Sequence, residues 1–434
     1  MKVAFYTLGC KVNQYETQAV AELFKKIGFE IVDFESKADV YVINTCTVTN
    51  ASDRKSRQVI KKARKLSPQS IVVVMGCYPQ VYPHEVEKIK DIDIIIGTKD
   101  RQKIVDYIKE YLENKKKIVA IDEGYKREAF EELKISEFNE RSRAFIKIEE
   151  GCEQFCSYCI IPYARGAVRS RSLKSIEEEV IRLVKRGYKE FVITGINISS
   201  YGKDLNGNVT LIDVIDRVNK IEGVKRIRLS SLEPVIMNDE FIERLLSFDK
   251  LCHHLHLSLQ SGSDKILKLM NRHYTTAQYQ GIVDRIREEW EDVAFTTDII
   301  VGFPGETEED FNATLEFVQK IGFSRIHVFR FSPKKGTKAF EMPNHVDNKE
   351  KERRSKIMKE VAERLSYQFH SKFVGKTLEV LIERDSDFDG YYEGYSGNYI
   401  RTLVRKTHTI IPGEIYKVKI IQAFEQYVKG EIIQ

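Results

Sequence analysis

Long apolar runs are missing from this 434-residue sequence. A membrane-spanning helix needs about 20 predominantly apolar residues in a row, and no stretch approaches that length. The first ten residues also lack the small-residue cleavage site that ends a secretory signal. We therefore expect a cytoplasmic protein with no membrane partner.

A strong excess of charge of either sign is also absent. The sequence has 70 Lys and Arg against 65 Asp and Glu, a formal net charge of +5. This balance permits an anionic partner without requiring one. With 42% hydrophobic and 31% charged residues, the composition is that of an ordinary globular protein. The length exceeds what one hydrophobic core usually organises, so we expect two or three domains.

Cysteine is scarce, with seven residues in the chain. In a reducing compartment, thiols within a motif are more typical of metal sites or catalysis than of disulfides. Cys252 matches no motif, and we interpret it as structural. The other six form two sets of three, namely Cys10, Cys46 and Cys77, and Cys152, Cys156 and Cys159.

The first part of the chain alternates short apolar runs with segments of helical spacing. Strands are predicted at residues 2–8, 39–45, 71–75 and 92–96. This succession predicts an N-terminal domain with a parallel sheet over residues 1–115. The highly charged residues 116–142 predict a linker.

A longer alternation fills residues 143–372. Strands are predicted at residues 145–148, 190–194, 226–230, 254–259, 295–301 and 325–331, and a helix at residues 348–373. Six β/α units predict a partial (β/α)6 barrel, whose chemistry would sit at the C-terminal ends of its strands. The period then changes to two, with strands at residues 377–382, 399–404, 414–421 and 426–432, so residues 373–434 predict a small β-barrel. The fold class is α/β.

The sharpest motif is C-x3-C-x2-C at Cys152, Cys156 and Cys159, just after the first strand of the predicted barrel. Three thiolates on one loop can hold an iron–sulfur cluster, and a four-iron cluster with three protein ligands keeps one iron open. A zinc site is the main alternative, but closed zinc sites usually take two pairs of ligands, and no second pair lies nearby. The spacing favours a 4Fe-4S cluster.

Cys10, Cys46 and Cys77 lie far apart in the sequence, yet each follows one of the first three predicted strands. The C-terminal ends of parallel strands share one edge of a sheet, so the three thiols can converge there. Gly9 and Gly76 precede two of them, and glycine lets the backbone approach a bulky inorganic group. We predict a second metal site, with three unrelated cysteines as the alternative.

The three-cysteine loop at the mouth of a β/α barrel resembles the radical S-adenosylmethionine superfamily. The resemblance implies that the open iron binds S-adenosyl-L-methionine (SAM) and that the reduced cluster cleaves it to a 5′-deoxyadenosyl radical. It also implies a set of residues that contact this cofactor. They are Tyr158, Gly195, Asn197, Ser230, Glu233 and Gln260.

Residues 8–16, 44–50 and 75–78, together with the order of the three domains, resemble the methylthiotransferase family, whose last domain is the RNA-binding TRAM module. The resemblance implies a second 4Fe-4S cluster on Cys10, Cys46 and Cys77 that delivers sulfur. One SAM would methylate that sulfur, and the radical from a second would remove hydrogen from C2 of an adenine in tRNA, which then takes the methylthio group. Electrons would come from a reductase such as flavodoxin or ferredoxin.

The substrate within the family is less constrained. Lys11-Val12-Asn13 stands where the isopentenyladenosine enzymes usually read Gln-Met-Asn, which favours N6-threonylcarbamoyladenosine at tRNA position 37. Its product would be 2-methylthio-N6-threonylcarbamoyladenosine. Isopentenyladenosine and a ribosomal-protein aspartate are the alternatives within the family, and a non-catalytic iron–sulfur regulator that binds RNA is the alternative outside it. The oligomeric state stays open.

Two further patterns bear on the substrate. His254, His256, Ser258 and Gln260 alternate with leucines along one strand, which predicts a polar barrel lumen. Seven cations also follow Cys46 on one predicted helix: Arg54, Lys55, Arg57, Lys61, Lys62, Arg64 and Lys65. They could steer a phosphate backbone, although a solvated helix face explains them equally well.

Overall fold

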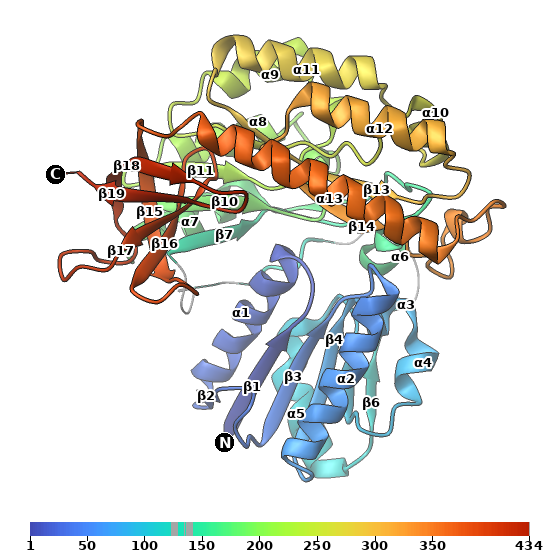
Figure 1. The fold of residues 1–434 in the computed structure, drawn as a ribbon. Coiled ribbons are helices and arrows are strands. Elements are labelled where there is room, and N and C mark those ends of the chain that lie inside the picture. Colours follow the sequence, from blue (N-terminus) through green and yellow to red (C-terminus); the bar gives the residue numbers. More distant parts are fainter. Residues whose placement is uncertain (123–128, 134, 136–141, 434) are drawn as a thin grey trace.

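The protein is described by a computed structural model that covers residues 1–122, 129–133, 135 and 142–433. It has an N-terminal α/β domain, a central β/α domain and a C-terminal barrel (Figure 1). The predicted fold class is confirmed. No helix among the described residues is long and apolar enough to cross a membrane.

The first sheet has parallel strands in the order β2-β1-β3-β4-β5-β6. Its strands are β1 (Lys2–Thr7), β2 (Glu30–Val32), β3 (Val40–Thr45), β4 (Ile71–Gly76), β5 (Ile94–Ile96) and β6 (Ile118–Ala120). Every residue of β3, β4 and β5 is buried, which explains their continuous apolar runs. The three-residue edge strands β2 and β6 were not predicted. Since β6 pairs with β5, the sheet extends into residues that the charge pattern assigned to the linker.

Helices cover both faces of this sheet. They are α1 (Lys11–Lys26), α2 (Asn50–Leu66), α3 (Cys77–Val81), α4 (Pro83–Glu87), η1 (Arg101–Lys103) and α5 (Ile104–Asn114). Val59 of α2 packs with Val72 and Val74 on one face. Phe24 of α1 and Ile104 of α5 pack with strand residues on the other. This doubly covered sheet holds the C-terminal ends of its strands toward the rest of the molecule (Figure 1).

The central domain contains two parallel sheets of three strands each. They are β7 (Arg143–Lys147), β10 (Glu190–Thr194) and β11 (Arg226–Leu229), then β12 (His254–His256), β13 (Ala294–Val301) and β14 (Arg325–Arg330). Isolated bridges, such as that between Leu232 and Leu257, connect β11 with β12. The open (β/α)6 succession therefore matches the sequence prediction, with a weakened ladder in its middle.

Helices surround these strands on the outside (Figure 1). They are α6 (Ile161–Arg165), α7 (Leu173–Val184), η2 (Ile198–Ser200), α8 (Leu211–Asn219), η3 (Pro234–Ile236), α9 (Asp239–Leu246), α10 (Asp264–Leu269), α11 (Thr276–Glu289), α12 (Glu308–Ile321), η4 (Lys338–Phe340) and α13 (Asn348–Ser371). Leu255, Leu257 and Leu259 join the core formed with these helices. A short antiparallel pair of β8 (Glu149–Glu150) and β9 (Arg169–Ser170) flanks the segment that contains α6.

The last domain is a closed barrel in the order β15-β16-β17-β19-β18. Its strands are β15 (Thr377–Asp385), β16 (Tyr391–Ser396), β17 (Arg401–Arg405), β18 (Ile415–Ala423) and β19 (Val428–Ile432). The sequence predicted the barrel but missed β16. Gly394, which suggested a break, lies inside β16 because a side chain there would overlap the carbonyl oxygen of Leu381 on β15.

The barrel of the last domain docks on the starts of the central strands. Arg226 donates to the carbonyl oxygen of Glu379 at 2.8 Å, and Arg228 donates to that of Ser396 at 3.0 Å. The ring of Tyr399 lies over the guanidinium of Arg228, at 4.7 Å from its centroid. The N-terminal ends of the central strands are thus covered, and their C-terminal ends remain on the side of the first domain.

Candidate active site

Three thiols gather at the C-terminal edge of the first sheet. Cys10 follows β1, Cys46 follows β3 and Cys77 follows β4. Thr45 pairs with Gly76, which brings the ends of β3 and β4 level. Burial raises the pKa of the Cys77 thiol to about 12, and the neighbouring thiols of Cys46 and Cys10 contribute to the rise. The three sulfur atoms therefore lie within electrostatic range of one another.

Glycine is required beside two of these thiols. Gly9 and Gly76 have φ values of 107° and 103°, in the left-handed region that favours glycine. A Cβ at Gly9 would lie 3.0 Å from the Cβ of Cys46, and one at Gly76 would lie 2.5 Å from Asn44 Oδ1. A side chain at either position would collide with the protein atoms that surround the thiols. The set of three thiol donors at one sheet edge fits an iron–sulfur cluster.

Two polar side chains contact this first set. The thiol of Cys10 lies 3.6 Å from Asn13 Oδ1, and Asn13 Nδ2 donates to the carbonyl oxygen of Leu8 at 2.7 Å. Arg165, from α6 of the central domain, donates through Nε to the sulfur of Cys77 at 3.2 Å and through a terminal nitrogen to Asn13 Oδ1 at 2.7 Å. One arginine therefore connects the central domain with two residues of the first site.

Arg165 belongs to a buried ionic network between the two domains. It contacts Glu16 of α1 at 2.5 Å and Glu150 of β8 at 2.8 Å, and all three side chains are nearly inaccessible. Arg101 and Lys147 also contact Glu16. Burial alone would raise the pKa of Glu16, but these three cations hold it at about 2. Sequence analysis missed the network because its members come from distant, individually unremarkable positions.

The second set of thiols lies on the loop between β8 and α6. Cys152 N donates to the carbonyl oxygen of Gly166 at 3.1 Å, and Cys159 N donates to that of Cys156 at 2.9 Å. Burial raises the pKa of Cys152 to about 12, with a further contribution from the thiol of Cys156. Burial and the other two thiols likewise raise the pKa of Cys159. The three thiols therefore lie within electrostatic range of one another, which fits a cluster that would displace their protons.

Several residues expected to contact the cofactor lie beside these thiols. Asn197 Nδ2 is 3.8 Å from the sulfur of Cys152. The pKa of the partly buried Tyr158 is raised by desolvation and then by Cys156. Glu233 pairs with both terminal nitrogens of Arg272, one of which also donates to the sulfur of Cys156 at 3.3 Å. Arg272 was not predicted, since nothing in its local sequence marks it.

The other expected contacts, Gly195, Ser230 and Gln260, follow the ends of barrel strands β10, β11 and β12. Gly195 packs against Glu149, where a Cβ would come within 2.7 Å of Oε2. Ser230 N donates to the carbonyl oxygen of Ile193, and Gln260 N donates to that of Asp298, both at 2.9 Å. Gln260 has a φ of 69°, an unusual conformation for a side chain of this size.

Glu149 is a further buried group that sequence analysis missed. Its Oε2 accepts a hydrogen bond from Asn197 N at 2.7 Å, whereas its Oε1 has no partner among the described residues. Burial raises its pKa well above the ordinary value. An unpartnered buried carboxylate beside the second thiol set is suited to accept a hydrogen bond from a bound cationic group.

Cys252 stays apart from both sets. Its backbone N–H donates to the carbonyl oxygen of Ile227 at 2.8 Å, and burial raises the pKa of its thiol to about 11. It is buried at the N-terminal side of the barrel, beside Arg228. This position agrees with the structural interpretation.

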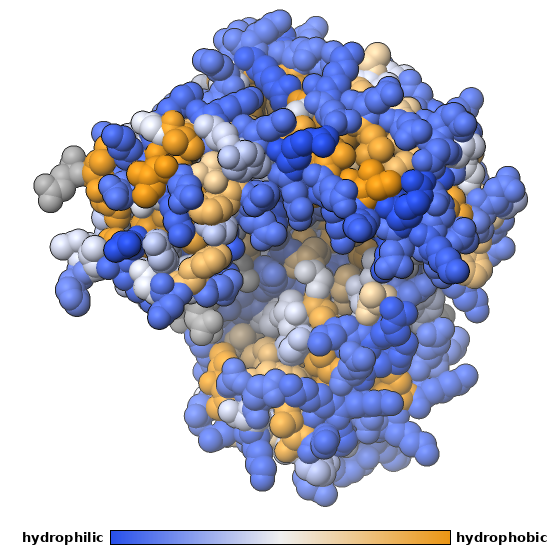
Figure 2. Space-filling model, viewed as in Figure 1, coloured by the Kyte–Doolittle hydropathy of each residue, from blue (hydrophilic) through white to orange (hydrophobic). Residues whose placement is uncertain are grey.

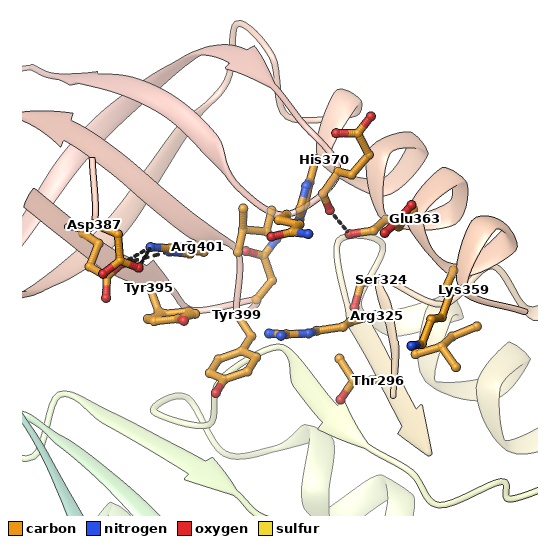
Figure 3. Close-up of a pocket in the computed structure, with 18 of the residues that line it drawn as sticks. Thr296, Ser324, Arg325, Lys359, Glu363, His370, Asp387, Tyr395, Tyr399 and Arg401 are labelled. Atoms are coloured by element: carbon orange, nitrogen blue, oxygen red, sulfur yellow. Dashed lines mark hydrogen bonds and ion pairs between the residues drawn. The ribbon is translucent and has the colours of Figure 1, made fainter. Parts of the chain in front are cut away.

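Two surfaces offer cations to a large anionic partner. On α2, Arg54, Lys55, Lys61 and Lys65 are exposed, whereas Arg57 and Arg64 are bonded to neighbouring side chains. A cavity of about 420 Å³ lies between the last domain, α13 and β14. Figure 3 shows Arg325, Lys359 and Arg401 around it, with Tyr395 and Tyr399. The predicted cation face on α2 is thus present in part.

Known families match the three domains separately. Residues 2–97 match the uncharacterized protein family UPF0004, residues 146–318 match the radical SAM superfamily and residues 371–433 match the TRAM domain. The threonylcarbamoyladenosine tRNA methylthiotransferase MtaB of Bacillus subtilis (strain 168) is 42% identical over 100% of this chain and 96% of its own length. The protein of that name from Aquifex aeolicus (strain VF5) is 41% identical over 93% of this chain and 100% of its own length. The chain belongs to the radical SAM methylthiotransferase family.

The methylthiotransferase family also includes relatives that are named for another tRNA base. The tRNA-2-methylthio-N(6)-dimethylallyladenosine synthase of Clostridium tetani is 37% identical over 98% of this chain and 95% of its own length. Among solved structures, the radical SAM methyltransferase TsrM of Kitasatospora setae covers 95% of this chain and 83% of its own, with a TM-score of 0.57 and 13% identity. That likeness shows the fold alone. The chain is accordingly a radical SAM enzyme, which uses SAM and a 4Fe-4S cluster.

Proposed function

We propose that this enzyme adds a methylthio group to C2 of N6-threonylcarbamoyladenosine at position 37 of tRNA. Likeness over the whole chain carries the proposal, since the relatives at 42% and 41% identity are named for that base. The relative named for dimethylallyladenosine is 37% identical. The Lys11-Val12-Asn13 segment supports the same choice.

In this proposal the two thiol sets hold two 4Fe-4S clusters. The ligands would be Cys152, Cys156 and Cys159 for the cluster that binds SAM, and Cys10, Cys46 and Cys77 for an auxiliary one. When bound, the first supplies the electron that cleaves SAM and the second supplies the sulfur. Radical chemistry is required because the C2–H bond of adenine has no acidity that a general base could use.

The surrounding side chains would orient bound SAM and compensate the charge of the cluster-ligating thiolates. Arg272 would place a fixed positive charge beside Cys156, and Glu233 would hold Arg272 in that orientation. Glu149 offers its free oxygen to the amino group of SAM. Arg165 would compensate the thiolate of Cys77 in the same way as Arg272 does at Cys156. Arg165, Arg272 and Glu149 are buried, so solvent screens their charges little.

The tRNA would approach across the surface between the domains. Figure 2 shows the molecule hollowed between the first domain and the other two. The exposed cations of α2 extend away from the edge that holds the first thiol set, because α2 begins at Asn50, shortly after Cys46. Arg54 and Lys55 lie nearest to that edge, and Lys61 and Lys65 lie toward the far end of the helix. We propose that they and the last domain contact the phosphate backbone. The enzyme would work in the cytoplasm with a reductase such as flavodoxin or ferredoxin.

The direct test offers anaerobically reconstituted enzyme three substrates in separate reactions. They are tRNA with N6-threonylcarbamoyladenosine at position 37, tRNA with isopentenyladenosine there, and the ribosomal protein whose aspartate other family members modify. Nucleoside and peptide mass spectrometry should detect a methylthio group on the first substrate alone. Methylthiolation of either other substrate with none on the first would overturn the proposal.

A simpler measurement distinguishes the proposed enzyme from a cluster-bearing regulator that has no catalytic activity. Such a protein would bind RNA but would not cleave SAM under reduction. We expect the enzyme to release 5′-deoxyadenosine, and Cys156→Ala to abolish the release. Nucleoside analysis of tRNA from cells lacking the protein should show unmodified N6-threonylcarbamoyladenosine in place of its 2-methylthio derivative.

A further inference from the structure

Lys11 occupies an unusual place between the three domains. It follows Cys10 and begins α1, at the end of that helix which meets the central domain (Figure 1). Its charge reaches residues of the other two domains. Burial lowers the pKa of His327 on β14, and the charges of Arg325 and Lys11 lower it further. Burial raises the pKa of Tyr399 in the last domain, but the charges of Arg143, Lys11 and Arg228 and a hydrogen bond with Arg143 outweigh it, so the pKa is lowered. The ammonium group therefore lies toward the barrel lumen.

The ammonium of Lys11 has no ion pair or hydrogen bond with any described residue, although the side chain is half-buried. Neighbouring cations differ in this respect. Arg143 is bonded to Glu383 at 2.8 Å, and Arg228 is bonded to Glu190 at 2.7 Å. Those two charges are compensated within the protein. Lys11 is left to attract an anion from outside.

A polar cluster lies on the lumen face of three strands. His256 of β12, Asp298 of β13 and His327 of β14 bring one nitrogen or oxygen each to within 4.8 Å of one another. His256 Nδ1 shares a hydrogen bond with Thr296 Oγ1 at 3.0 Å, while its buried Nε2 has no hydrogen-bond partner. Asp298 is 30% exposed, although it lies in the middle of a strand. Solvent, and hence a ligand, reaches this cluster.

The charges around the cluster favour an anion over a metal ion. Two histidines and a carboxylate are a set that could hold a divalent cation. However, Lys11 and Arg325 both lie close enough to lower the pKa of His327, and their positive charges would oppose a cation there. An organic acid that also carries N–H or O–H donors satisfies the lysine and the aspartate together.

The chemistry of the substrate allows such an acid to reach this cluster. C2 and C6 flank N1 of the adenine ring, so the C2–H bond and the C6–N6 bond leave the ring in diverging directions. When C2 points to the thiol sets at the C-terminal ends of the strands, the N6 substituent can extend away from them into the lumen. Asp298 and His327 lie within their strands, below those ends, and His256 is the last residue of β12. A threonylcarbamoyl substituent carries one carboxylate, one hydroxyl and urea N–H groups.

We propose that Lys11, Asp298 and His327 form the subsite that binds the amino-acid substituent on N6 of the target adenine, with Lys11 holding its carboxylate. Asp298 accepts hydrogen bonds from the urea or hydroxyl groups, and His327 closes the side of the subsite. Lys11 is thus a specificity-determining residue. This inference rests on the proposed function, because it needs an acidic N6 substituent.

The test compares two anticodon stem-loops that differ in one group. One carries N6-threonylcarbamoyladenosine at position 37, and the other carries its carboxyl methyl ester. Wild-type enzyme with both clusters and SAM should bind the acid about 10- to 100-fold more tightly than the ester, the range expected for a charged hydrogen bond. Lys11→Gln should bind both with the same affinity, whereas Lys11→Arg should keep part of the preference.

Kinetics separate specificity from a merely structural role. Lys11→Gln should raise KM for the acid and leave kcat and the KM for the ester near their wild-type values. The matched control is Lys26→Gln, at the exposed far end of the same helix, which should leave both KM values unchanged. Equal losses on acid and ester in Lys11→Gln, or a preserved preference for the acid, would overturn the inference.

The outcomes also separate this inference from the proposed function. Wild-type enzyme that modifies isopentenyladenosine and ignores N6-threonylcarbamoyladenosine overturns the proposed function itself. Wild-type enzyme that modifies the acid and the ester with equal kcat/KM overturns only the subsite. Stoichiometric zinc or manganese that is lost in His327→Asn, measured by elemental analysis, would identify a metal site and also overturn the subsite.

Discussion

At the residue scale, Cys252 is the natural control for the six motif cysteines. We expect Cys156→Ala to lower the iron content of reconstituted protein from about eight to about four atoms per chain. Cys252→Ala should keep about eight, because its thiol lies apart from both sets. Iron analysis and the spectrum of the reduced clusters measure both variants. Loss of iron from Cys252→Ala would contradict the assignment of ligands.

Glu16 should make the stability of the protein depend on pH. Its pKa is held at about 2 in the fold, against an ordinary value of 4.5. A depressed carboxyl pKa stabilises the fold fully above the unfolded value, and the contribution is lost as pH falls from about 4.5 to about 2. A shift of this size corresponds to about 3 kcal/mol.

Denaturant unfolding of cluster-free protein checks this expectation. At pH 7, Glu16→Gln should cost about 3–5 kcal/mol, because it leaves buried cations without their counter-charge. The difference from wild type should shrink below about pH 4.5. Glu30→Gln, which removes an exposed pair with Lys2, should cost about 0–1 kcal/mol at any pH. A difference for Glu16→Gln that stays constant with pH would refute the expected titration.

At the element scale, β16 shows where a local pattern fails. Glycine weakens a strand prediction, yet Gly394 is required where β15 and β16 approach closely. We expect Gly394→Val to destabilise the last domain by about 1–3 kcal/mol, because the new side chain overlaps the backbone of Leu381. Gly397→Ala is the control, since nothing lies within 4 Å of a Cβ there. Thermal unfolding distinguishes the two variants, because only Gly394→Val should lower the unfolding temperature of the last domain.

Long buried elements were predictable and short edge elements were not. The continuous apolar runs of β3 and β4 identify them from sequence alone, because both faces are covered. β2 and β6 have three residues each and gain their strand geometry from pairing with a neighbour. Periodicity cannot reveal a strand of that length.

The candidate site also contains residues that were predictable from the sequence and residues that were not. Cys10, Cys46 and Cys77 were expected at one sheet edge because topology alone brings strand ends together. Arg165 and Arg272, which contact the sulfurs of Cys77 and Cys156, were not expected. Their roles depend on how α6 and the segment after α10 pack, and no local pattern encodes such contacts.

At the scale of the whole molecule, the cation face of α2 should contribute to RNA affinity. Reversing Lys61 and Lys65 to Glu should weaken tRNA binding and reduce the slope of log K against log salt by about two, if each contacts one phosphate. The control reverses Lys109 on α5, which covers the opposite face of the sheet. Titrations at several salt concentrations measure the slope. Equal slopes in wild type and the double variant would show that α2 faces away from the RNA.

The two thiol sets differ in what must happen before they can bind iron. Cys152, Cys156 and Cys159 lie on one loop, so even a partly folded chain can present them together. Cys10, Cys46 and Cys77 come from three separate strands and meet only after the sheet has formed. If the sheet edge holds the proposed auxiliary cluster, its maturation has a fixed order, in which folding precedes metallation. A cell short of iron would then accumulate chains that are folded at that edge and lack the proposed cluster.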